Sequence, residues 1–329
     1  KSKNSEYKSW RLFQIVFITI LINDIVNIER RNVCDLLHVM TGGGKSEAYF
    51  GIVIFTMFYD RLKGKKYGVS AITKFPLRML SIQQLQRIAN LVIFAEKIRS
   101  EENIEGNPFS IAYFVGSQDE EFPRNNFKIR ENIIEAKKKN NEIKGKIINI
   151  CPLCGGEVVL DINDENGTVL HKCKKCNEKF RLYYSDDEIY RMLPTFIVST
   201  VDKFSGVSTN RRFKNLFGGR IDQCPDGHGI IPRNDKCEFK FESKICNMKG
   251  NMLNPSFNTG PTLIIQDEMH LIKEGFGTID SHFETLIEEL HKEFGGESFK
   301  NIAMTATISG AKSQIKHLYN KDTFIFPPK

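Results

Sequence analysis

Residues 41–46 read Thr-Gly-Gly-Gly-Lys-Ser and lie between two apolar stretches, residues 33–40 and 48–59. The first stretch is predicted to be a buried strand and the second a buried helix. Strand, glycine turn, Lys-Ser and helix together are typical of a phosphate-binding loop, because glycines let backbone N–H groups approach phosphate oxygens at a helix N-terminus. The predicted nucleotide-binding residues are Thr41, Gly42, Gly43, Gly44, Lys45 and Ser46.

Within this loop, Lys45 is expected to reach the β- and γ-phosphates of ATP, and Ser46 to offer its hydroxyl to Mg²⁺. One position departs from the general pattern, since Val39 stands where its first glycine is expected. The alternative is a glycine-rich turn that binds no ligand.

The composition is that of a globular protein and bounds its partners. The chain has 329 residues, of which 40% are hydrophobic and 26% charged, enough for one large or two ordinary domains. The net charge is +7, and basic residues gather in residues 124–146 and 203–220. Such clusters suit a nucleic-acid backbone, although a solvated helical face is the alternative for the first of them.

The apolar run at residues 15–22 is too short to span a bilayer, so we predict a cytoplasmic protein without a membrane partner.

Apolar strands alternate with helical patterns along most of the chain, which predicts an α/β fold with a mostly parallel sheet covered on both faces. Polar stretches interrupt this order and are read as insertions. The predicted divisions are a helical segment at 1–32, parts of one lobe at 33–116, 191–209 and 260–329, an insertion at 117–190 with a zinc ribbon at about 147–183, and a basic, Cys-containing insertion at 210–259.

A predicted strand at residues 262–267 leads directly into a pair of carboxylates, Asp267 and Glu268. Asp267 stands where an acid can hold Mg²⁺ beside a phosphate-binding loop, and Glu268 is placed to orient or deprotonate the attacking water. The carboxyl ends of parallel strands meet at one edge of a sheet, so Lys45, Asp267 and Thr305 are expected to lie close together. The alternative is an ordinary strand end with exposed acids.

These motifs resemble those of the superfamily-two helicases of the Asp-Glu-x-His type. Residues 41–46 match motif I, residues 267–270 motif II and residues 305–307 (Thr-Ala-Thr) motif III. Residues 76–78 resemble motif Ia and residues 199–203 a later strand-contacting motif. The resemblance implies a RecA-like P-loop NTPase lobe in which His270, with Lys45, Asp267 and Glu268, serves hydrolysis. It further implies coupling by His270, Thr305 and Thr307, and nucleic-acid contacts by Pro76, Arg78, Gln83, Thr200 and Lys203.

A narrower resemblance, to the helicase subunit of DISARM phage-defence systems, rests on Trp10, Phe13-Gln14 and the runs 41–49, 76–84, 200–204 and 266–272. It implies a DNA substrate, a role in anti-phage defence and the subunits of a defence complex as partners. Nothing in the chain resembles motifs IV to VI, which belong to a second lobe and supply an arginine finger. We therefore expect that lobe elsewhere in the full protein or in a partner subunit, with weak hydrolysis in its absence. The alternatives are an ATP-switched nucleic-acid-binding module and an RNA-remodelling helicase.

Eight cysteines could suggest disulfides in a secreted protein, but four of them form Cys-x-x-Cys pairs, which in a cytosolic protein favours metal. Two Cys-x-x-Cys pairs 18 residues apart present the four thiolates that Zn²⁺ prefers, so Cys151, Cys154, Cys173 and Cys176 are predicted to hold a structural zinc ion between hairpin strands 158–160 and 169–171. Unligated thiols are the alternative. Cys224, His228, Cys237 and Cys246 are more irregularly spaced, and a second zinc site and free cysteines both remain open.

Overall fold

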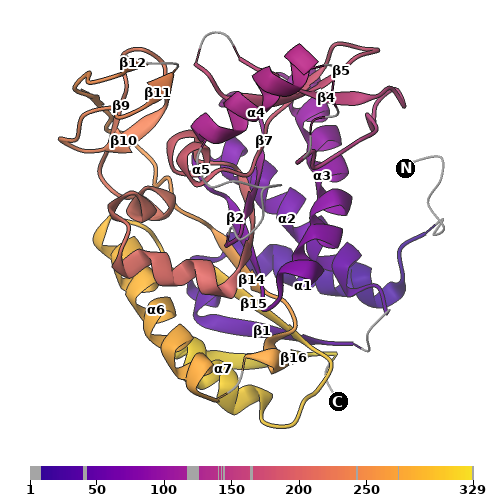
Figure 1. The fold of residues 1–329 in the computed structure, drawn as a ribbon. Helices are drawn as coiled ribbons and strands as arrows, with labels where there is room; N and C mark the ends of the chain where they lie inside the picture. The colour runs from indigo at the N-terminus through magenta and orange to yellow at the C-terminus, as the bar shows by residue number, and fades with distance from the viewer. Residues whose placement is uncertain are drawn as a thin grey trace.

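A central sheet of eight strands organises the protein, of which the computed structural model describes residues 9–39, 43–116, 126–139, 141, 143, 145–163, 166–241, 244–272 and 274–327. The strand order is β16-β1-β15-β14-β2-β8-β3-β7, and every neighbouring pair is parallel (Figure 1). The strands are β1 (Val33–His38), β2 (Ala71–Phe75), β3 (Ile111–Phe114), β7 (Leu182–Tyr183), β8 (Phe196–Thr200), β14 (Leu263–Gln266), β15 (Lys300–Thr305) and β16 (Asp322–Phe326).

Helices cover both faces of this sheet. One face packs under α1 (Leu12–Val26), α2 (Lys45–Leu62) and α3 (Arg78–Glu101), and the other under α6 (Glu274–Glu293), α7 (Ala311–Tyr319) and the 3₁₀ helices η2 (Val201–Ser208) and η3 (Arg211–Phe217). Successive side chains of a strand point to opposite faces. Accordingly Leu263 and Ile265 join the core under α1–α3, while Ile264 joins the core under α6. The predicted α/β fold with a parallel sheet is confirmed.

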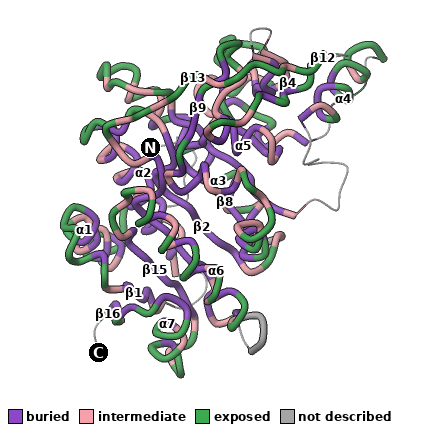
Figure 2. The backbone as a smooth tube through the Cα atoms, turned by 90° about the vertical axis from the view of Figure 1, so that its left-hand side faces the viewer, coloured by how far each residue is buried: buried purple, intermediate pink, exposed green. Residues whose placement is uncertain are grey.

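Two local features shape the first part of the lobe. Strand β2 begins at Ala71, because Gly68 turns the chain with φ +108° where its backbone approaches Thr259. In the N-terminal helix, Phe17 and Leu21 are buried against α2, whereas Leu12 is 77% exposed. Figure 2 shows the strands buried and outward turns of the helices exposed.

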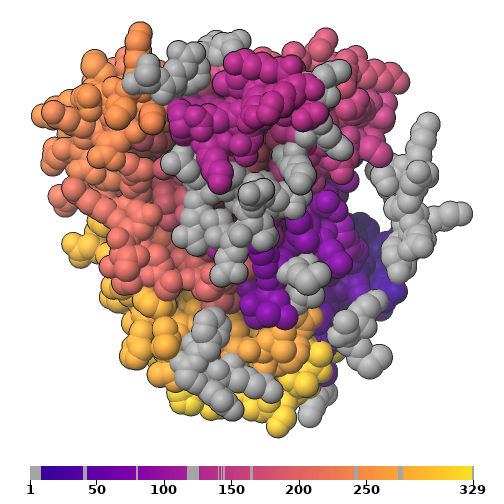
Figure 3. Space-filling model, in the orientation of Figure 1, coloured from indigo at the N-terminus to yellow at the C-terminus, as the bar shows by residue number. Residues whose placement is uncertain are grey.

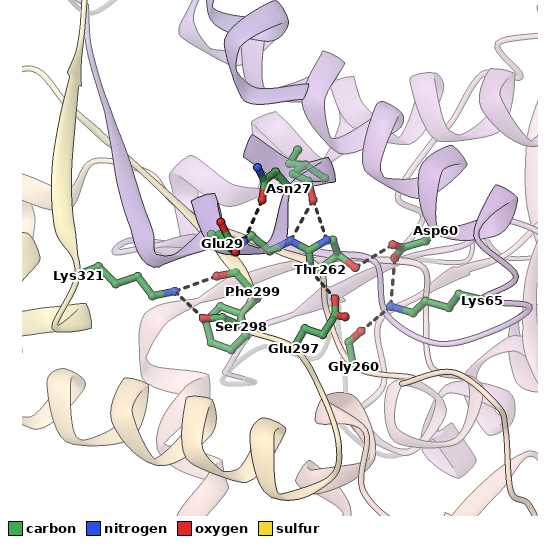
Figure 4. A network of polar contacts seen from close by, with 12 residues as sticks. Asn27, Glu29, Asp60, Lys65, Gly260, Thr262, Glu297, Ser298, Phe299 and Lys321 are labelled. Atoms are coloured by element: carbon green, nitrogen blue, oxygen red, sulfur yellow. Dashed lines mark hydrogen bonds and ion pairs between the residues drawn. The ribbon is translucent and has the colours of Figure 1, made fainter. Parts of the chain in front are cut away.

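Buried polar contacts tie together the loops at the amino ends of the strands (Figure 4). Lys65 follows α2, and its amine binds Asp60 (3.1 Å) and the Gly260 carbonyl (2.5 Å). Asp60 also accepts a hydrogen bond from Thr262 (2.8 Å), directly before β14. At β15 and β16, Lys321 donates to the Phe299 carbonyl (2.8 Å). The amino ends of the strands are therefore held together by charge-assisted hydrogen bonds, and the carboxyl ends of the strands carry the predicted motifs.

The insertions form small modules at one end of the lobe. The first contains α4 (Asn126–Lys139) and the three-stranded sheet β4 (Val158–Ile162), β5 (Val169–Cys173) and β6 (Lys179–Phe180). The chain returns to the lobe through β7 and α5 (Asp186–Met192). The second contains β9 (Ile221–Gln223), β10 (Ile230–Pro232), β11 (Lys240–Phe241), β12 (Lys244–Ile245) and β13 (Asn251–Met252). Two further 3₁₀ turns are η1 (Ile28–Asn32) and η4 (Met269–Leu271). None of the helices in the described residues is long and apolar enough to cross a membrane.

Candidate functional site

The described part of the glycine loop ends directly at the first residue of α2. Thr41 and Gly42 lie outside the described residues. Gly44 precedes the helix in the left-handed region (φ +91°), where glycine carries no steric penalty. Gln14 donates from Nε2 to the Gly44 carbonyl (2.8 Å), and Arg11 donates to the Gly43 carbonyl (2.6 Å). Residues at the start of helix α1 thus hydrogen-bond to the loop, a role that the sequence motifs did not predict for either residue.

The Lys45 side chain is the most informative group of the site. It is 7% exposed, and its amine lies 3.7 Å from Glu268 Oε1 but makes no hydrogen bond to a described residue. The other lysines buried among the described residues all donate hydrogen bonds; they are Lys65, Lys74, Lys203, Lys300 and Lys321. A buried ammonium is costly unless its donors are satisfied. Lys45 is therefore suited to an anionic ligand such as a phosphate.

Asp267 lies at the end of β14, beside the carboxyl end of β2. Its backbone N–H donates to the Lys74 carbonyl (2.9 Å), which continues the pairing of the two strands by one residue. Burial, together with the nearby charge of Glu268, raises the pKa of Asp267 to about 6. A carboxylate in such a place gains from a cation, so Asp267 fits the expected Mg²⁺ ligand.

Glu268 occupies a strained backbone position for a residue with a side chain, with φ +44°. Its N–H donates to Asp267 Oδ1 (2.8 Å), and this local bond helps to hold the turn. The left-handed conformation costs roughly 1–2 kcal/mol for an L-residue. Strain of this kind is characteristic of functional sites, and here it directs the Glu268 carboxylate toward Lys45.

The second and third motifs meet through His270. Its Nδ1 lies 3.4 Å from Glu268 Oε2 and 3.3 Å from Thr305 Oγ1. Thr305 Oγ1 in turn accepts the Thr307 N–H (3.2 Å). A continuous polar chain therefore runs from Lys45 to Thr307 through side chains that sequence analysis predicted. His38 was not predicted, and its Nε2 lies 3.1 Å from the Ala306 carbonyl, which ties β1 to the same loop.

The predicted strand-contact residues follow neighbouring strands. Phe75 and Thr200 are register partners in β2 and β8, so the segment of Pro76 and Arg78 lies beside that of Thr200. Arg78 is half-buried and contacts the Gly116 carbonyl (3.4 Å), and Gln83 is exposed. Thr200 is buried.

Lys203 differs from the expected open phosphate contact. Its side chain is 8% exposed, its amine binds both oxygens of Asp186 at 2.8 Å, and it lies over the Phe114 ring at 4.5 Å. In this conformation a phosphate would have to displace Asp186. The basic stretch that contains Lys203 is also partly neutralised, because Arg212 pairs with Asp187 (3.0 Å) and Arg211 with Asp235 (2.9 Å).

Two groups of four side chains in the described residues could hold a metal ion. In the first, the four sulfurs of the predicted ribbon lie within 4.8 Å of one another, with Cys151–Cys176 at 3.8 Å and Cys154–Cys173 at 3.4 Å. Four sulfurs around zinc are expected about 3.8 Å apart. The backbone N–H groups of Cys176 and Lys175 lower the pKa of the Cys173 thiol to about 6, which favours the thiolate. The second group consists of Cys224, His228, Cys237 and Cys246.

Comparison with known proteins places this geometry in a class. No protein-family model matches the chain. Among solved structures, the DEAD-box helicase Mss116 bound to ssRNA and UDP-BeF shares the fold with a TM-score of 0.50 at 13% identity, covering 97% of this chain and 40% of that one. The DUF1998 helicase MrfA gives a TM-score of 0.47 at 10% identity, covering 97% of this chain and 30% of that one. The fold is therefore that of a RecA-like lobe.

The sequence adds a particular relative. The chain is 32% identical over 355 aligned positions to the DISARM protein DrmA of Bacillus paralicheniformis (strain ATCC 9945a / NCIMB 11709 / CD-2). The alignment includes 98% of this chain and 31% of the relative, so the chain spans about a third of that protein's length. The resemblance to a DISARM protein is therefore confirmed along nearly the whole chain.

Proposed function

We propose that this chain is the ATP-hydrolysing lobe of a DNA helicase or translocase that acts in phage defence. The observation that supports it most directly is Lys45, whose buried amine lies beside Glu268 and lacks a hydrogen bond to any described residue. The similarity to the DISARM protein DrmA supports the defence role. The choice of DNA rests on the motifs that resemble the DISARM helicase subunit.

Each residue of the site has a role in this proposal. Lys45 neutralises phosphate charge, Ser46 and Asp267 hold Mg²⁺, and Glu268 takes the proton of the attacking water. A bound Mg²⁺ would stabilise the charge that develops on the transferred phosphoryl group. His270 contacts both Glu268 and Thr305, so it is placed to transmit a change at the phosphates to the loop after β15. Full turnover requires a second lobe that supplies an arginine, and a relative about three times as long has room for one.

The ribbon belongs to the same proposal as a structural element. We assign a zinc ion to Cys151, Cys154, Cys173 and Cys176, because a four-sulfur set leaves no coordination position for chemistry. Its contribution is to fold the insertion beside α4, which carries part of the basic surface.

The test uses the intact protein and separates binding from hydrolysis. Glu268→Gln should retain ATP affinity, because Lys45 and Asp267 are unchanged. It should lose about a hundred- to ten-thousand-fold in hydrolysis rate, because an amide cannot accept the water's proton. Lys45→Ala should lose ATP binding itself.

Matched controls are Glu289→Gln and Lys63→Ala, both exposed and distant from the loop in sequence. Both should retain the parent affinity and rate. Hydrolysis at the parent rate by Glu268→Gln would rule out the active site proposed here.

A further inference from the structure

The second Cys/His group is assembled by two turns that face each other. Cys224 and His228 lie on the loop between β9 and β10, where the Cys224 N–H donates to the Gly229 carbonyl (2.9 Å). Cys237 and Cys246 lie on a hairpin, in which Cys246 donates its N–H to the Phe239 carbonyl (2.9 Å). Residues far apart in the chain therefore present their ligand atoms to one point.

The distances between these atoms agree with a tetrahedral metal site. Cys224 Sγ lies 3.8 Å from Cys246 Sγ and 3.5 Å from His228 Nδ1, and Cys237 Sγ lies 3.8 Å from His228 Nδ1. Zinc with ordinary bond lengths predicts about 3.8 Å between two sulfurs and about 3.6 Å between sulfur and nitrogen. The irregular spacing in the sequence left this site open, and the folded geometry supports it.

The turns that carry the four ligands have a small core of their own. The strands of the module are two or three residues long; Ile221 and Ile230 pack toward the lobe, and the cluster at the site consists of Cys224, Ile231, Cys237 and Phe239 with Cys246 beside them. So few apolar side chains at the site offset only part of the entropy of ordering these turns. A metal ion bonded to its cysteines would supply that stabilisation.

A buried arginine provides an independent indication. Arg191, on α5, is 4% exposed, and its guanidinium donates to Cys237 Sγ (3.3 Å). It also lies over the Phe239 ring at 5.5 Å, while His228 stacks on that ring at 4.4 Å. A buried guanidinium needs a negative partner, and a neutral thiol is a poor one. Three thiolates exceed the charge of Zn²⁺ by one, so a zinc site gives Arg191 the anionic partner that no described carboxylate provides.

Helix α5 connects this site to the rest of the molecule. At its N-terminus Asp186 binds Lys203, and one turn before Arg191 the Glu188 carboxylate accepts the Val169 N–H of the ribbon (2.6 Å). One short helix thus contacts the second cysteine group, a strand of the ribbon and the segment after β8. Figure 3 shows the orange second insertion on the same end of the molecule as α4.

We propose that Cys224, His228, Cys237 and Cys246 bind a second structural zinc ion, and that this ion, through Arg191 and α5, fixes the segment of Lys203. The metal claim is independent of the proposed helicase function. The positioning claim concerns that function, because residues 200–203 are the expected strand contacts.

The first experiment measures zinc in the intact protein by elemental analysis. Within this chain we expect two zinc ions, one of which is lost in Cys246→Ser and the other in Cys151→Ser. Since a variant can fail to fold, a second measurement uses metal-free protein in which the ribbon cysteines are replaced and Cys224, His228, Cys237 and Cys246 are kept. Co²⁺ is added to this protein. A thiolate-to-cobalt charge-transfer band with the visible spectrum of a tetrahedral three-sulfur, one-nitrogen site supports the proposal. Zinc content unchanged by Cys246→Ser, or no such band, overturns it.

The second experiment tests Arg191. Arg191→Met should release zinc from the second site to a chelator at about ten- to a hundred-fold lower concentration, and Arg191→Lys should recover part of that affinity. Arg211→Met removes an exposed arginine nearby and should leave both sites unchanged. Equal chelator sensitivity in Arg191→Met and the parent would overturn the role of Arg191.

Hydrogen exchange tests the connection to η2. On loss of the second zinc, amides of residues 201–208 should exchange faster, while those of α2 keep the parent rate. Unchanged exchange in η2 after zinc loss would overturn the positioning claim. A protein that binds two zinc ions but no nucleic acid would instead contradict the proposed function and leave the second site intact.

Discussion

At the scale of single residues, the partners of a buried charge indicate its role. Lys74 is fully buried on β2 and forms an ion pair with Glu284 of α6. Lys300 is fully buried on β15 and binds Asp24 and Asp35, which join α1 and β1 to the sheet. Both lysines thus have anionic partners within the protein. Lys45 is also buried but makes no hydrogen bond to a described residue, so its charge remains available to a ligand.

Glu188 provides a pH-dependent prediction at this scale. Burial raises the pKa of its carboxyl to about 7, although the Val169 N–H and the Ser185 hydroxyl donate to it. The folded state thus holds the proton more tightly than the unfolded chain, whose glutamate has a pKa of about 4.3. The resulting stabilisation is complete below the unfolded pKa and is lost as the pH rises through about 7. We expect roughly 1 kcal/mol of unfolding free energy to be lost between pH 6 and pH 8.

The measurement is chemical denaturation at pH 6 and pH 8. In Glu188→Gln, which does not titrate, the part of the pH dependence due to this residue should disappear. Glu131→Gln on the exposed side of α4 should keep the parent's dependence. The same pH dependence in Glu188→Gln and the parent would show that the buried carboxyl does not titrate in this range.

The positions of the candidate site residues were predictable from local sequence. Asp267 and Glu268 follow a short apolar strand, and position along a parallel strand fixes which end of the sheet they reach. The surroundings of Lys203 were not predictable in this way, because its partner Asp186 lies 17 residues away on a helix within a polar region. Arg11 and His38 were missed for the same reason, because each acts by touching a backbone carbonyl distant in sequence.

At the scale of elements, α1 both packs on α2 and contacts the glycine loop. Its apolar residues surround the helix, so composition predicted burial but not which side packs on α2. The buried side includes Phe17 and Leu21, and the exposed side includes Leu12 and Ile15. The same packing brings Gln14 to the Gly44 carbonyl. The strands were predictable because buried parallel strands read as apolar runs, whereas β7 and β9–β13 are too short to show a period.

A substitution in α1 should therefore affect nucleotide affinity. Gln14→Met keeps the length of the side chain and removes its hydrogen bond to the glycine loop. A hydrogen bond of this kind contributes about 1 kcal/mol, so ATP affinity should fall roughly fivefold while the melting temperature changes little. Ile15→Ala truncates an exposed neighbour on the same helix and serves as control. Equal ATP affinity in Gln14→Met and the parent, measured by calorimetry, would show that α1 does not support the loop.

At the scale of the whole molecule, the amino and carboxyl ends of the strands differ in their contacts. The amino ends are held together by buried ion pairs such as Lys65–Asp60. The carboxyl-terminal edge carries Lys45, Glu268 and Thr305, whose contacts are weaker and longer. The insertions add a third region: the second has a small apolar cluster around its own cysteines, whereas the apolar side chains of the ribbon continue the lobe's core.

This separation predicts the effect of removing the ribbon's metal. Replacing Cys151 and Cys173 with serine should remove one zinc and destabilise the insertion, because the remaining thiolates lose the metal that holds them together, while its apolar side chains still pack on the lobe. ATP affinity should stay within about twofold of the parent, since Lys45 and Asp267 lie in the lobe's own core. Limited proteolysis and ATP titration report the two outcomes. A large loss of ATP affinity would show that the ribbon and the lobe fold as one unit.

Arg78 allows the proposed nucleic-acid contact to be tested in the intact protein. Arg78 begins α3 beside β8, and a phosphate contact there would release counterions from the strand. Arg78→Ala should therefore weaken single-strand binding similarly for all sequences and reduce the slope of log K against log salt by about 0.7. Lys97→Ala, at the far end of the same helix, should change neither quantity. Because the Arg78 guanidinium also contacts the Gly116 carbonyl, the melting temperature of Arg78→Ala must be compared with that of the parent. A uniform loss of affinity with an unchanged salt slope would mean that Arg78 orders the loop after β3 and does not bind phosphate.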